Sequence, residues 1–161
     1  MNYINIISAS CVDFESWSTV LQVSGCDHMC KGCFNKQAWK SSYGKPFTEK
    51  TYRELIVMAS KPYISNVCIQ GGDIFFRKNR EEGLKLIKRL HEDLPNKSIV
   101  VWTGYTLKEV QDDPLMSKTL RYIDYLIDGK YQQDSPTSKK WRGSDNQYLY
   151  SIKNGVPTLI D

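Results

Sequence analysis

The chain has 161 residues, of which 40% are hydrophobic and 25% charged, as in an ordinary globular protein with one hydrophobic core. Its 22 basic and 18 acidic residues give a net charge of +4, and because the basic residues are scattered, we expect no nucleic-acid partner. No apolar run approaches the roughly 18 residues that span a bilayer, and the N-terminus lacks signal-peptide features, so we expect a cytoplasmic protein with no membrane partner.

Patterns that favour strands alternate with patterns that favour helices in most of the chain. β-branched and apolar runs predict strands at residues 19–23, 67–69, 98–102 and 123–127. Helical spacing predicts a short helix at 35–39, longer helices at 49–60 and 80–93, and weaker ones at 107–110 and 115–120. In the 80–93 helix we expect Leu84, Ile87 and Leu90 to be buried. Residues 131–147 are polar and indicate a loop or lid, followed by a hairpin at 148–160 that turns at Asn154-Gly155.

This alternation predicts an α/β fold with a mostly parallel sheet. In such folds the loops that follow the carboxyl ends of the strands build the active site. The unusual residues of this chain lie in those loops: a group of cysteines, Gly71-Gly72-Asp73, Thr103-Gly104-Tyr105 and Asp128-Gly129. We therefore expect them to meet at one edge of the sheet.

Residues 25–35, called the cysteine loop below, contain Cys26, Cys30 and Cys33 in the spacing C-x3-C-x2-C. In a cytoplasmic protein, clustered cysteines bind metal or carry out redox chemistry more often than they form disulfides. Iron–sulfur clusters normally take four thiolate ligands, so three local cysteines either recruit a distant fourth ligand or leave one iron open. Cys11 and Cys68 are isolated in sequence and are interpreted as buried thiols. Trp39, just beyond the loop, is a candidate anchor to the core.

Zinc is the alternative metal, and it requires four ligands in a tetrahedral arrangement. Only Cys30 and Cys33 form a C-x2-C pair, and His28 as a fourth ligand would crowd the loop. The Gly71-Gly72 pair would let backbone carbonyls approach a ligand closely, and a cationic amine suits such carbonyls. Asp73 either contacts that ligand or caps the next helix.

The cysteine motif followed by Phe34 resembles the signature of radical S-adenosylmethionine (SAM) enzymes. The chain is also similar to the activating enzymes of anaerobic (class III) ribonucleoside-triphosphate reductases in a longer series of residues: Trp39, Gly71-Gly72-Asp73, Thr103-Gly104-Tyr105, Asp124, Asp128-Gly129-Lys130, Arg142-Gly143-Ser144 and Asn146-Gln147. The resemblance implies one radical SAM domain over residues 1–161, folded as a partial, open (β/α) barrel. Its core would cover about 18–130, and a C-terminal loop and hairpin about 131–161.

The resemblance also implies an activity. Cys26, Cys30 and Cys33 would hold a 4Fe–4S cluster whose open iron binds SAM. The sites implied for SAM itself are Gly32, Cys33 and Phe34 on the adenine side, and Gly71, Gly72 and Asp73 around the methionyl amine. Reductive cleavage of SAM would yield a 5′-deoxyadenosyl radical that removes a hydrogen atom from a glycine of the partner, the large catalytic subunit of the reductase. The electron would come from a donor such as flavodoxin or a thioredoxin-like protein.

Other functions remain open at this stage. The chain could activate another glycyl-radical enzyme of the pyruvate formate-lyase type, act as a radical SAM enzyme on a small molecule, or serve as a zinc-binding adaptor without catalysis. The chain departs at two places from the family that it resembles. Members of that family usually carry a Gly-Pro-Gly-like segment and an arginine where this chain has residues 15–19 (Glu-Ser-Trp-Ser-Thr). They also usually have a proline after Gly-Gly-Asp, where this chain has Ile74.

Overall fold

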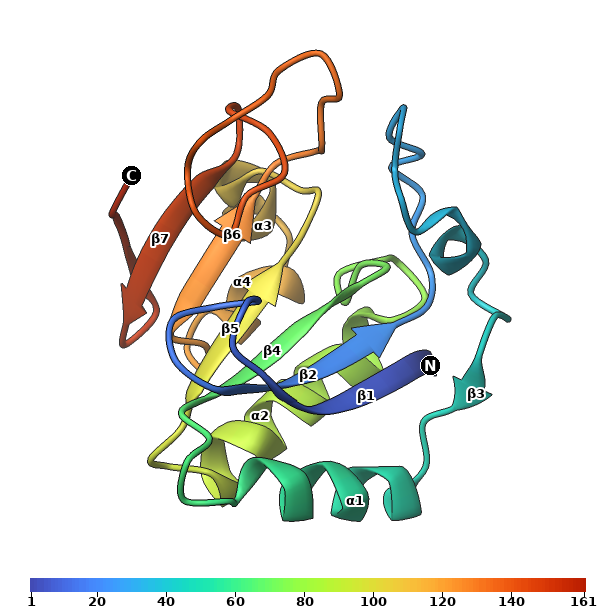
Figure 1. The fold of residues 1–161 in the computed structure, drawn as a ribbon, viewed down its shortest axis with the longest axis vertical. Coiled ribbons are helices and arrows are strands. Elements are labelled where there is room, and N and C mark those ends of the chain that lie inside the picture. The colour runs from blue at the N-terminus through green and yellow to red at the C-terminus, as the bar shows by residue number, and fades with distance from the viewer.

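The computed structural model describes all 161 residues, which form an α/β structure around one open sheet (Figure 1). The strands are β1 (Asn2–Ser10), β2 (Ser18–Val23), β3 (Lys45–Pro46), β4 (Asn66–Gly71), β5 (Ser98–Trp102), β6 (Tyr125–Asp128), β7 (Tyr148–Lys153) and β8 (Val156–Leu159). The helices are α1 (Glu49–Ala59), α2 (Arg80–Asp93), α3 (Leu107–Asp112) and α4 (Met116–Thr119), with a 3₁₀ turn, η1 (Lys36–Trp39). None of them is long and apolar enough to cross a lipid bilayer.

The sheet has the strand order β3-β1-β2-β4-β5-β6-β7-β8. Its four central strands, β2, β4, β5 and β6, pair in parallel, whereas every pairing outside them is antiparallel. The expectation of a mostly parallel sheet is therefore correct for the centre and wrong for the edges. Connectivity explains two of the four antiparallel pairings: β1 to β2 and β7 to β8 are joined by loops too short for a crossover helix, and such loops produce antiparallel neighbours.

Most predicted elements are present, and β5 and α2 have the expected bounds. Within α2, however, Leu86 is buried and Leu84 only half-buried, so the expected apolar stripe is shifted there. The strand expected at 123–127 begins two residues later, at Tyr125. Ile123 is buried like a strand residue but lies ahead of the strand, which made the apolar run look longer than the strand itself. Strands β1 and β3 were not expected. The side chains of β1 are at most half-buried, and its register with β2 is interrupted twice, which obscures the alternation of a regular strand.

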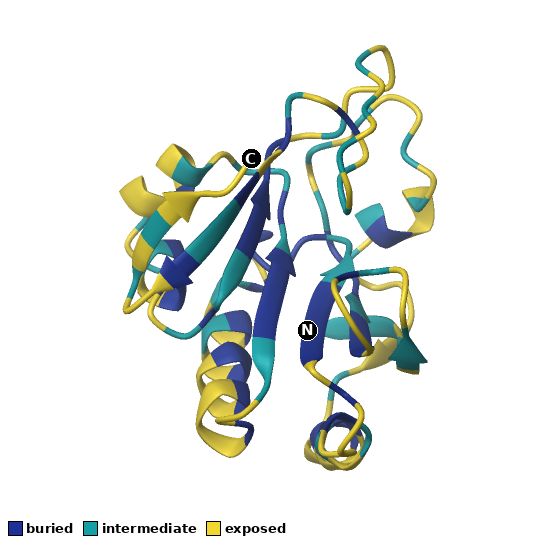
Figure 2. Cartoon of the chain, turned by 60° about the vertical axis from the view of Figure 1, so that its left-hand side comes forward, coloured by how far each residue is buried: buried dark blue, intermediate teal, exposed yellow.

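Successive residues of the parallel strands face opposite sides of the sheet, and they form two separate clusters. The larger cluster joins one face to all four α-helices, through residues such as Leu21, Ile69 and Val101. The smaller cluster lies on the other face and contains Val20, Cys68, Val100, Ile127 and Leu149. Figure 2 shows the buried centre of the sheet flanked by exposed loops.

No helix contributes to the smaller cluster. Instead, Phe14, from the loop that joins β1 to β2, is buried in it. The Phe14 ring contacts the rings of Trp141 and Tyr125, with centroids 4.5 and 4.9 Å away. In Figure 1 this blue loop passes in front of β4 and β5. One loop thus covers the face of the sheet that the helices leave free.

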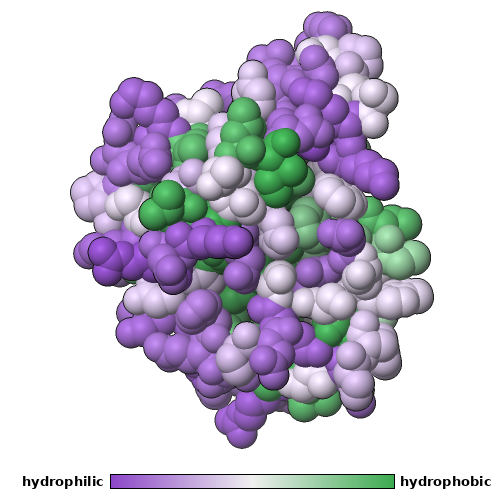
Figure 3. Space-filling view, turned by 90° about the vertical axis from the view of Figure 1, so that its left-hand side faces the viewer, coloured by the Kyte–Doolittle hydropathy of each residue, from purple (hydrophilic) through white to green (hydrophobic).

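On the side that carries β7 and β8, apolar side chains are scattered among polar ones. Figure 3 shows them as separate green patches on a largely purple surface. Val156, Leu159 and Ile160 are among the exposed apolar residues of this terminal hairpin.

Candidate functional site

The cysteine loop begins where β2 ends, and its two ends are held together by the backbone. The N–H of Gly25 donates to the carbonyl of Ala38 at 2.7 Å, and the N–H of Cys26 to that of Trp39 at 3.3 Å. Ala38 is 1% exposed, whereas the Trp39 side chain is half-buried. The loop is therefore anchored by η1 through buried Ala38 and two backbone carbonyls, rather than by burial of the Trp39 ring that we expected.

All three cysteines of this loop are half-buried, free thiols. The loop folds tightly because Gly25, Met29 and Gly32 adopt positive φ angles of 99°, 49° and 75°. A turn follows, in which the N–H of Cys33 donates to the carbonyl of Cys30 at 3.1 Å. No three His, Cys, Asp or Glu side chains of the structure form a group that could hold a metal ion as they stand.

The donor chemistry of this loop suits an iron–sulfur cluster. Burial raises the pKa of the Cys26 thiol to about 12 and also raises that of Cys30, although the backbone N–H of Tyr131 hydrogen-bonds Cys30 and opposes the rise in its pKa. Both groups are thiols at neutral pH, so they become ligands only when a metal displaces their protons. Cys68 lies buried in the smaller cluster, as expected, but Cys11 is exposed, so its interpretation as a buried thiol was wrong.

The Gly71-Gly72 pair lies directly against the start of the cysteine loop. The N–H of Gly72 donates to the carbonyl of Val23 at 2.7 Å, and that of Asp73 to the carbonyl of Gly25 at 2.8 Å. A Cβ on Gly72 would lie 2.7 Å from the Gly25 oxygen, and Gly71 has a φ of 104°. The two glycines are thus required by the close approach of β2 to β4, independently of any ligand.

Asp73 is 2% exposed, and groups of the chain itself bind both of its carboxylate oxygens. Thr103 Oγ1 donates to it at 2.8 Å, the N–H of Gly104 at 2.9 Å and the N–H of Phe75 at 2.8 Å. The N-cap of α2 is Asn79, so the helix-capping alternative for Asp73 was wrong. The carboxylate instead ties the loop after β4 to the loop after β5.

His28, which we considered only as an awkward zinc ligand, is the remaining partner of Asp73. Its Nε2 lies 2.8 Å from Asp73 Oδ2, and its side chain is 6% exposed. The imidazole packs against Gly104 and meets the ring of Tyr105 edge-on at a centroid distance of 4.5 Å. One signal in the sequence could have identified this residue: it lies between two cysteines, in a loop expected to face Gly71-Gly72-Asp73.

The outer side of the cysteine loop is open. Phe34 is 97% exposed and Gly32 is also exposed. The polar segment that follows β6 contacts the loop at Lys31 and Gly32. Gln133 lies against Gly32, and Lys31 Nζ is 3.6 Å from a carboxylate oxygen of Asp134. Between them lies a surface cavity of about 300 Å³, lined by Lys31 and by residues 131–135.

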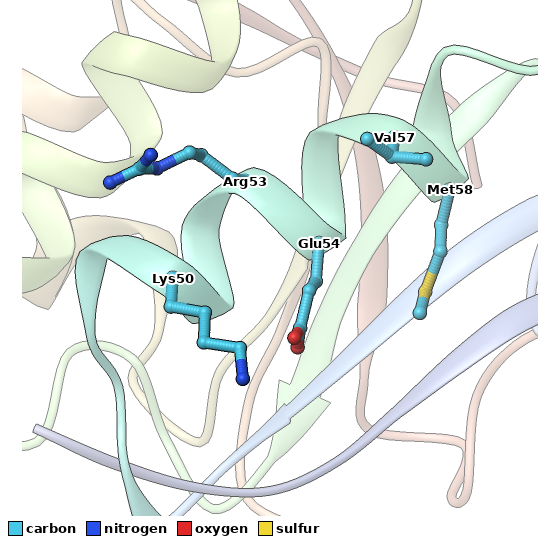
Figure 4. Close-up of a pocket in the computed structure, with 5 residues that line it drawn as sticks. All are labelled: Lys50, Arg53, Glu54, Val57 and Met58. Atoms are coloured by element: carbon cyan, nitrogen blue, oxygen red, sulfur yellow. The ribbon is translucent and has the colours of Figure 1, made fainter.

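A larger cavity, of about 570 Å³, lies elsewhere, on the outer side of α1 (Figure 4). It is lined by Lys50, Arg53, Glu54, Val57 and Met58, all from that one helix. In Figure 1 α1 lies at the opposite end of the molecule from the cysteine loop. None of the motif residues contributes to this cavity, so we place the functional site at the cysteine loop.

Comparisons with known proteins show the family to which the chain belongs. A family model described as a 4Fe-4S single cluster domain matches residues 15–150. The chain is 40% identical to the anaerobic ribonucleoside-triphosphate reductase-activating protein of Enterobacteria phage T4, over 97% of each chain. It is 40% identical to the protein of that name from Pasteurella multocida (93% of this chain, 97% of the relative) and 35% identical to that of Escherichia coli K12 (95% and 100%). The chain belongs to the family of anaerobic ribonucleoside-triphosphate reductase-activating proteins.

Proposed function

We propose that this chain is a radical SAM enzyme, one domain over residues 1–161 with a partial, open barrel, that generates a glycyl radical on an anaerobic ribonucleoside-triphosphate reductase. The observation that carries the proposal is the junction of the cysteine loop with Gly71-Gly72-Asp73 at the ends of two parallel strands, β2 and β4. The family membership and the 4Fe-4S family model support it.

In this proposal Cys26, Cys30 and Cys33 hold a 4Fe–4S cluster and leave one iron open. When bound and reduced, the cluster supplies the electron that cleaves SAM to methionine and a 5′-deoxyadenosyl radical, which takes a hydrogen atom from a glycine of the reductase. The three thiols come from a single loop, and the backbone N–H of Tyr131 is available to Cys30. Such N–H groups tune the potential of a cluster.

The proposed SAM site lies between the two loops. Backbone groups of Gly71 and Gly72 hold the methionyl amine, while Gly32, Cys33 and Phe34 lie on the adenine side. The exposure of Phe34 supports this role, because a ring that is 97% exposed is free to cover a bound adenine. Because both oxygens of Asp73 already accept hydrogen bonds, we assign Asp73 the task of fixing the Gly71-Gly72 backbone rather than contacting the amine.

The partner in this proposal is the large catalytic subunit of the reductase, whose glycine-bearing loop approaches the open side of the cysteine loop. An external donor such as flavodoxin or a thioredoxin-like protein supplies the electron, and the reaction takes place in the cytoplasm. A radical intermediate requires a site closed to water, and here the reductase itself completes that closure.

The test is anaerobic reconstitution of the protein with iron and sulfide, followed by reduction and addition of SAM. We expect a brown protein that produces methionine and 5′-deoxyadenosine. With its reductase, it should also give a glycyl-radical signal in electron paramagnetic resonance (EPR). A reconstituted protein that cleaves SAM but leaves the reductase without a radical would contradict the assigned partner. Radical formation on a pyruvate formate-lyase in its place would favour the alternative activase. A colourless protein with one zinc and no iron would favour the adaptor.

A further inference from the structure

The middle of the cysteine loop places one side chain, that of His28, against the loops that follow β4 and β5. Among residues 27–32, Asp27, Met29, Lys31 and Gly32 are exposed and Cys30 is half-buried. Only the side chain of His28, at 6% exposed, is buried. Residues 131–134 contact Cys30, Lys31 and Gly32 from the polar segment, whereas His28 connects this part of the loop to the loop that follows β4.

The pocket that receives His28 is formed by the two loops that follow β4 and β5. Asp73 Oδ2 lies 2.8 Å from Nε2, and the ring of Tyr105 meets the imidazole edge-on. Gly104 forms one wall: a Cβ at that position would lie 2.3 Å from the imidazole, so only glycine leaves room for it. Tyr105 in turn makes a cation–π contact with the guanidinium of Arg80, whose central carbon lies 5.3 Å from the centre of the ring.

The direction of the hydrogen bond follows from its surroundings. Asp73 Oδ2 accepts from Thr103 Oγ1 and from the N–H of Gly104. We therefore take the Nε2 of His28, 2.8 Å away, as the third donor to this oxygen. The contact joins residues 45 positions apart in sequence and links the loop of the three cysteines to the backbone of Gly71-Gly72.

We propose that His28 is a positioning residue that latches the cysteine loop onto Asp73 and so fixes the distance between the cluster ligands and the backbone of Gly71-Gly72. This inference rests on the proposed function, because both halves of the SAM site must be held in one geometry before SAM can bridge them. His28 touches neither SAM nor iron in this role. We expect its effect on SAM binding to exceed its effect on cluster assembly, because its side chain hydrogen-bonds Asp73 and none of the three thiols.

Two variants separate the latch from simple packing. His28→Phe fills the pocket but removes the N–H donor, while His28→Gln keeps a donor near the position of Nε2. In the reconstituted protein we expect His28→Phe to retain its iron but to bind SAM about tenfold more weakly, as expected for a lost hydrogen bond to a buried carboxylate. The change that SAM produces in the EPR spectrum of the reduced cluster should shrink. His28→Gln should recover to within about threefold of the wild-type affinity.

Hydrogen exchange gives a readout that does not depend on the cluster. Before iron is added, the amides of residues 26–33 should exchange faster in His28→Phe than in the wild type or in His28→Gln. If His28→Phe kept the exchange rates and the SAM affinity of the wild type, the latch would be overturned. The same conclusion would follow if His28→Phe and His28→Gln lost SAM affinity equally, or if neither variant folded. Failure of the wild type itself to assemble a cluster or cleave SAM would count against the proposed function instead, and the exchange comparison would still report on the latch.

Discussion

Gly72 is the residue at which the two halves of the proposed site come closest. Its own N–H bonds to Val23, and an added Cβ would lie 2.7 Å from the backbone oxygen of Gly25, which no side-chain rotation can relieve. We therefore expect Gly72→Ala to lower the free energy of unfolding by about 1–3 kcal/mol, as overpacking does, and to displace Cys26. The matched control is Gly143→Ala, whose added Cβ would meet side-chain atoms only, from the half-buried ring of Tyr131 and from Gln147. Thermal unfolding and iron content after reconstitution measure both effects. A Gly72→Ala protein with the stability and iron content of the wild type would contradict the close approach of Gly72 to Gly25.

The five cysteines divide by environment into proposed ligands and bystanders. We expect Cys26→Ala, Cys30→Ala and Cys33→Ala each to abolish SAM cleavage, because a cluster held by only two thiolates is not retained. Cys11 is exposed on the loop between β1 and β2, so Cys11→Ala should keep full activity and serves as the control. Cys68→Ala should also keep activity, with a modest loss of stability from its buried position. Loss of iron from a folded Cys68→Ala protein would show that the ligand set is wrong.

At the level of residues, spacing along the chain predicts less than the structure reveals. The three cysteines could be identified because C-x3-C-x2-C is a local pattern. The sequence marks His28 only by its place between two cysteines, whereas its role depends on a contact with Asp73 that only the folded sheet creates. The same is true of Gly71 and Gly72: both were expected to face a ligand, yet the close approach of β2 is reason enough for glycine at each.

Among the elements, the loop between β1 and β2 packs on the face of the sheet that the helices leave free. It folds Phe14 into the smaller cluster, where the ring is 4% exposed. Residues 15–19 are fixed by Asn66, whose side chain donates to the carbonyl of Glu15 and, at 3.1 Å, to Ser18 Oγ. Asp13 receives a hydrogen bond from Gln70 at 2.7 Å, one residue before Gly71. The loop therefore reaches the edge of the proposed site.

This burial can be tested by comparing two phenylalanines. We expect Phe14→Ala to lower the free energy of unfolding by about 3 kcal/mol, because it leaves a cavity against Trp141 and Tyr125. Phe34→Ala should change stability by less than about 0.5 kcal/mol, because its ring is 97% exposed, but it should weaken SAM binding. Chemical denaturation measures the first effect and titration of the reconstituted protein the second. Equal stability of the two variants would show that Phe14 is not a core residue in solution.

How well each element could be predicted depends on its burial. The strongly patterned β5 and α2 have the expected bounds, because each presents a fully buried face to the core. Strand β1 was not predicted, because its side chains are at most half-buried and bulges shift its register with β2. The short β3 consists of Lys45 and Pro46, which carry no strand pattern, and only its pairing with β1 makes it a strand.

For the molecule as a whole, the C-terminal part belongs to the same sheet as the parallel strands. The N–H of Tyr148 donates to Asp128 at 3.2 Å, and the side chain of Gln147 donates to the carbonyl of Gly129 at 2.8 Å. Ile152 lies in the larger core cluster and Leu149 in the smaller one. Residues after 130 thus complete both cores as well as the edge of β6.

A chain that ends after Lys130 should accordingly fail to fold, although it would contain the whole core that the resemblance implies, about 18–130. The truncation removes β7, which leaves the edge of β6 opposite β5 unpaired and exposes the side chains that Ile152 and Leu149 cover. A control chain that ends after Gly155 loses only β8, whose residues Val156 and Leu159 are already exposed, and it should remain folded with a smaller loss of stability. Circular dichroism and cooperative thermal unfolding distinguish the two. Cooperative unfolding of the shorter chain would mean that the four parallel strands and their helices are stable on their own, and that β7 and β8 serve only to position the polar segment beside the cysteine loop.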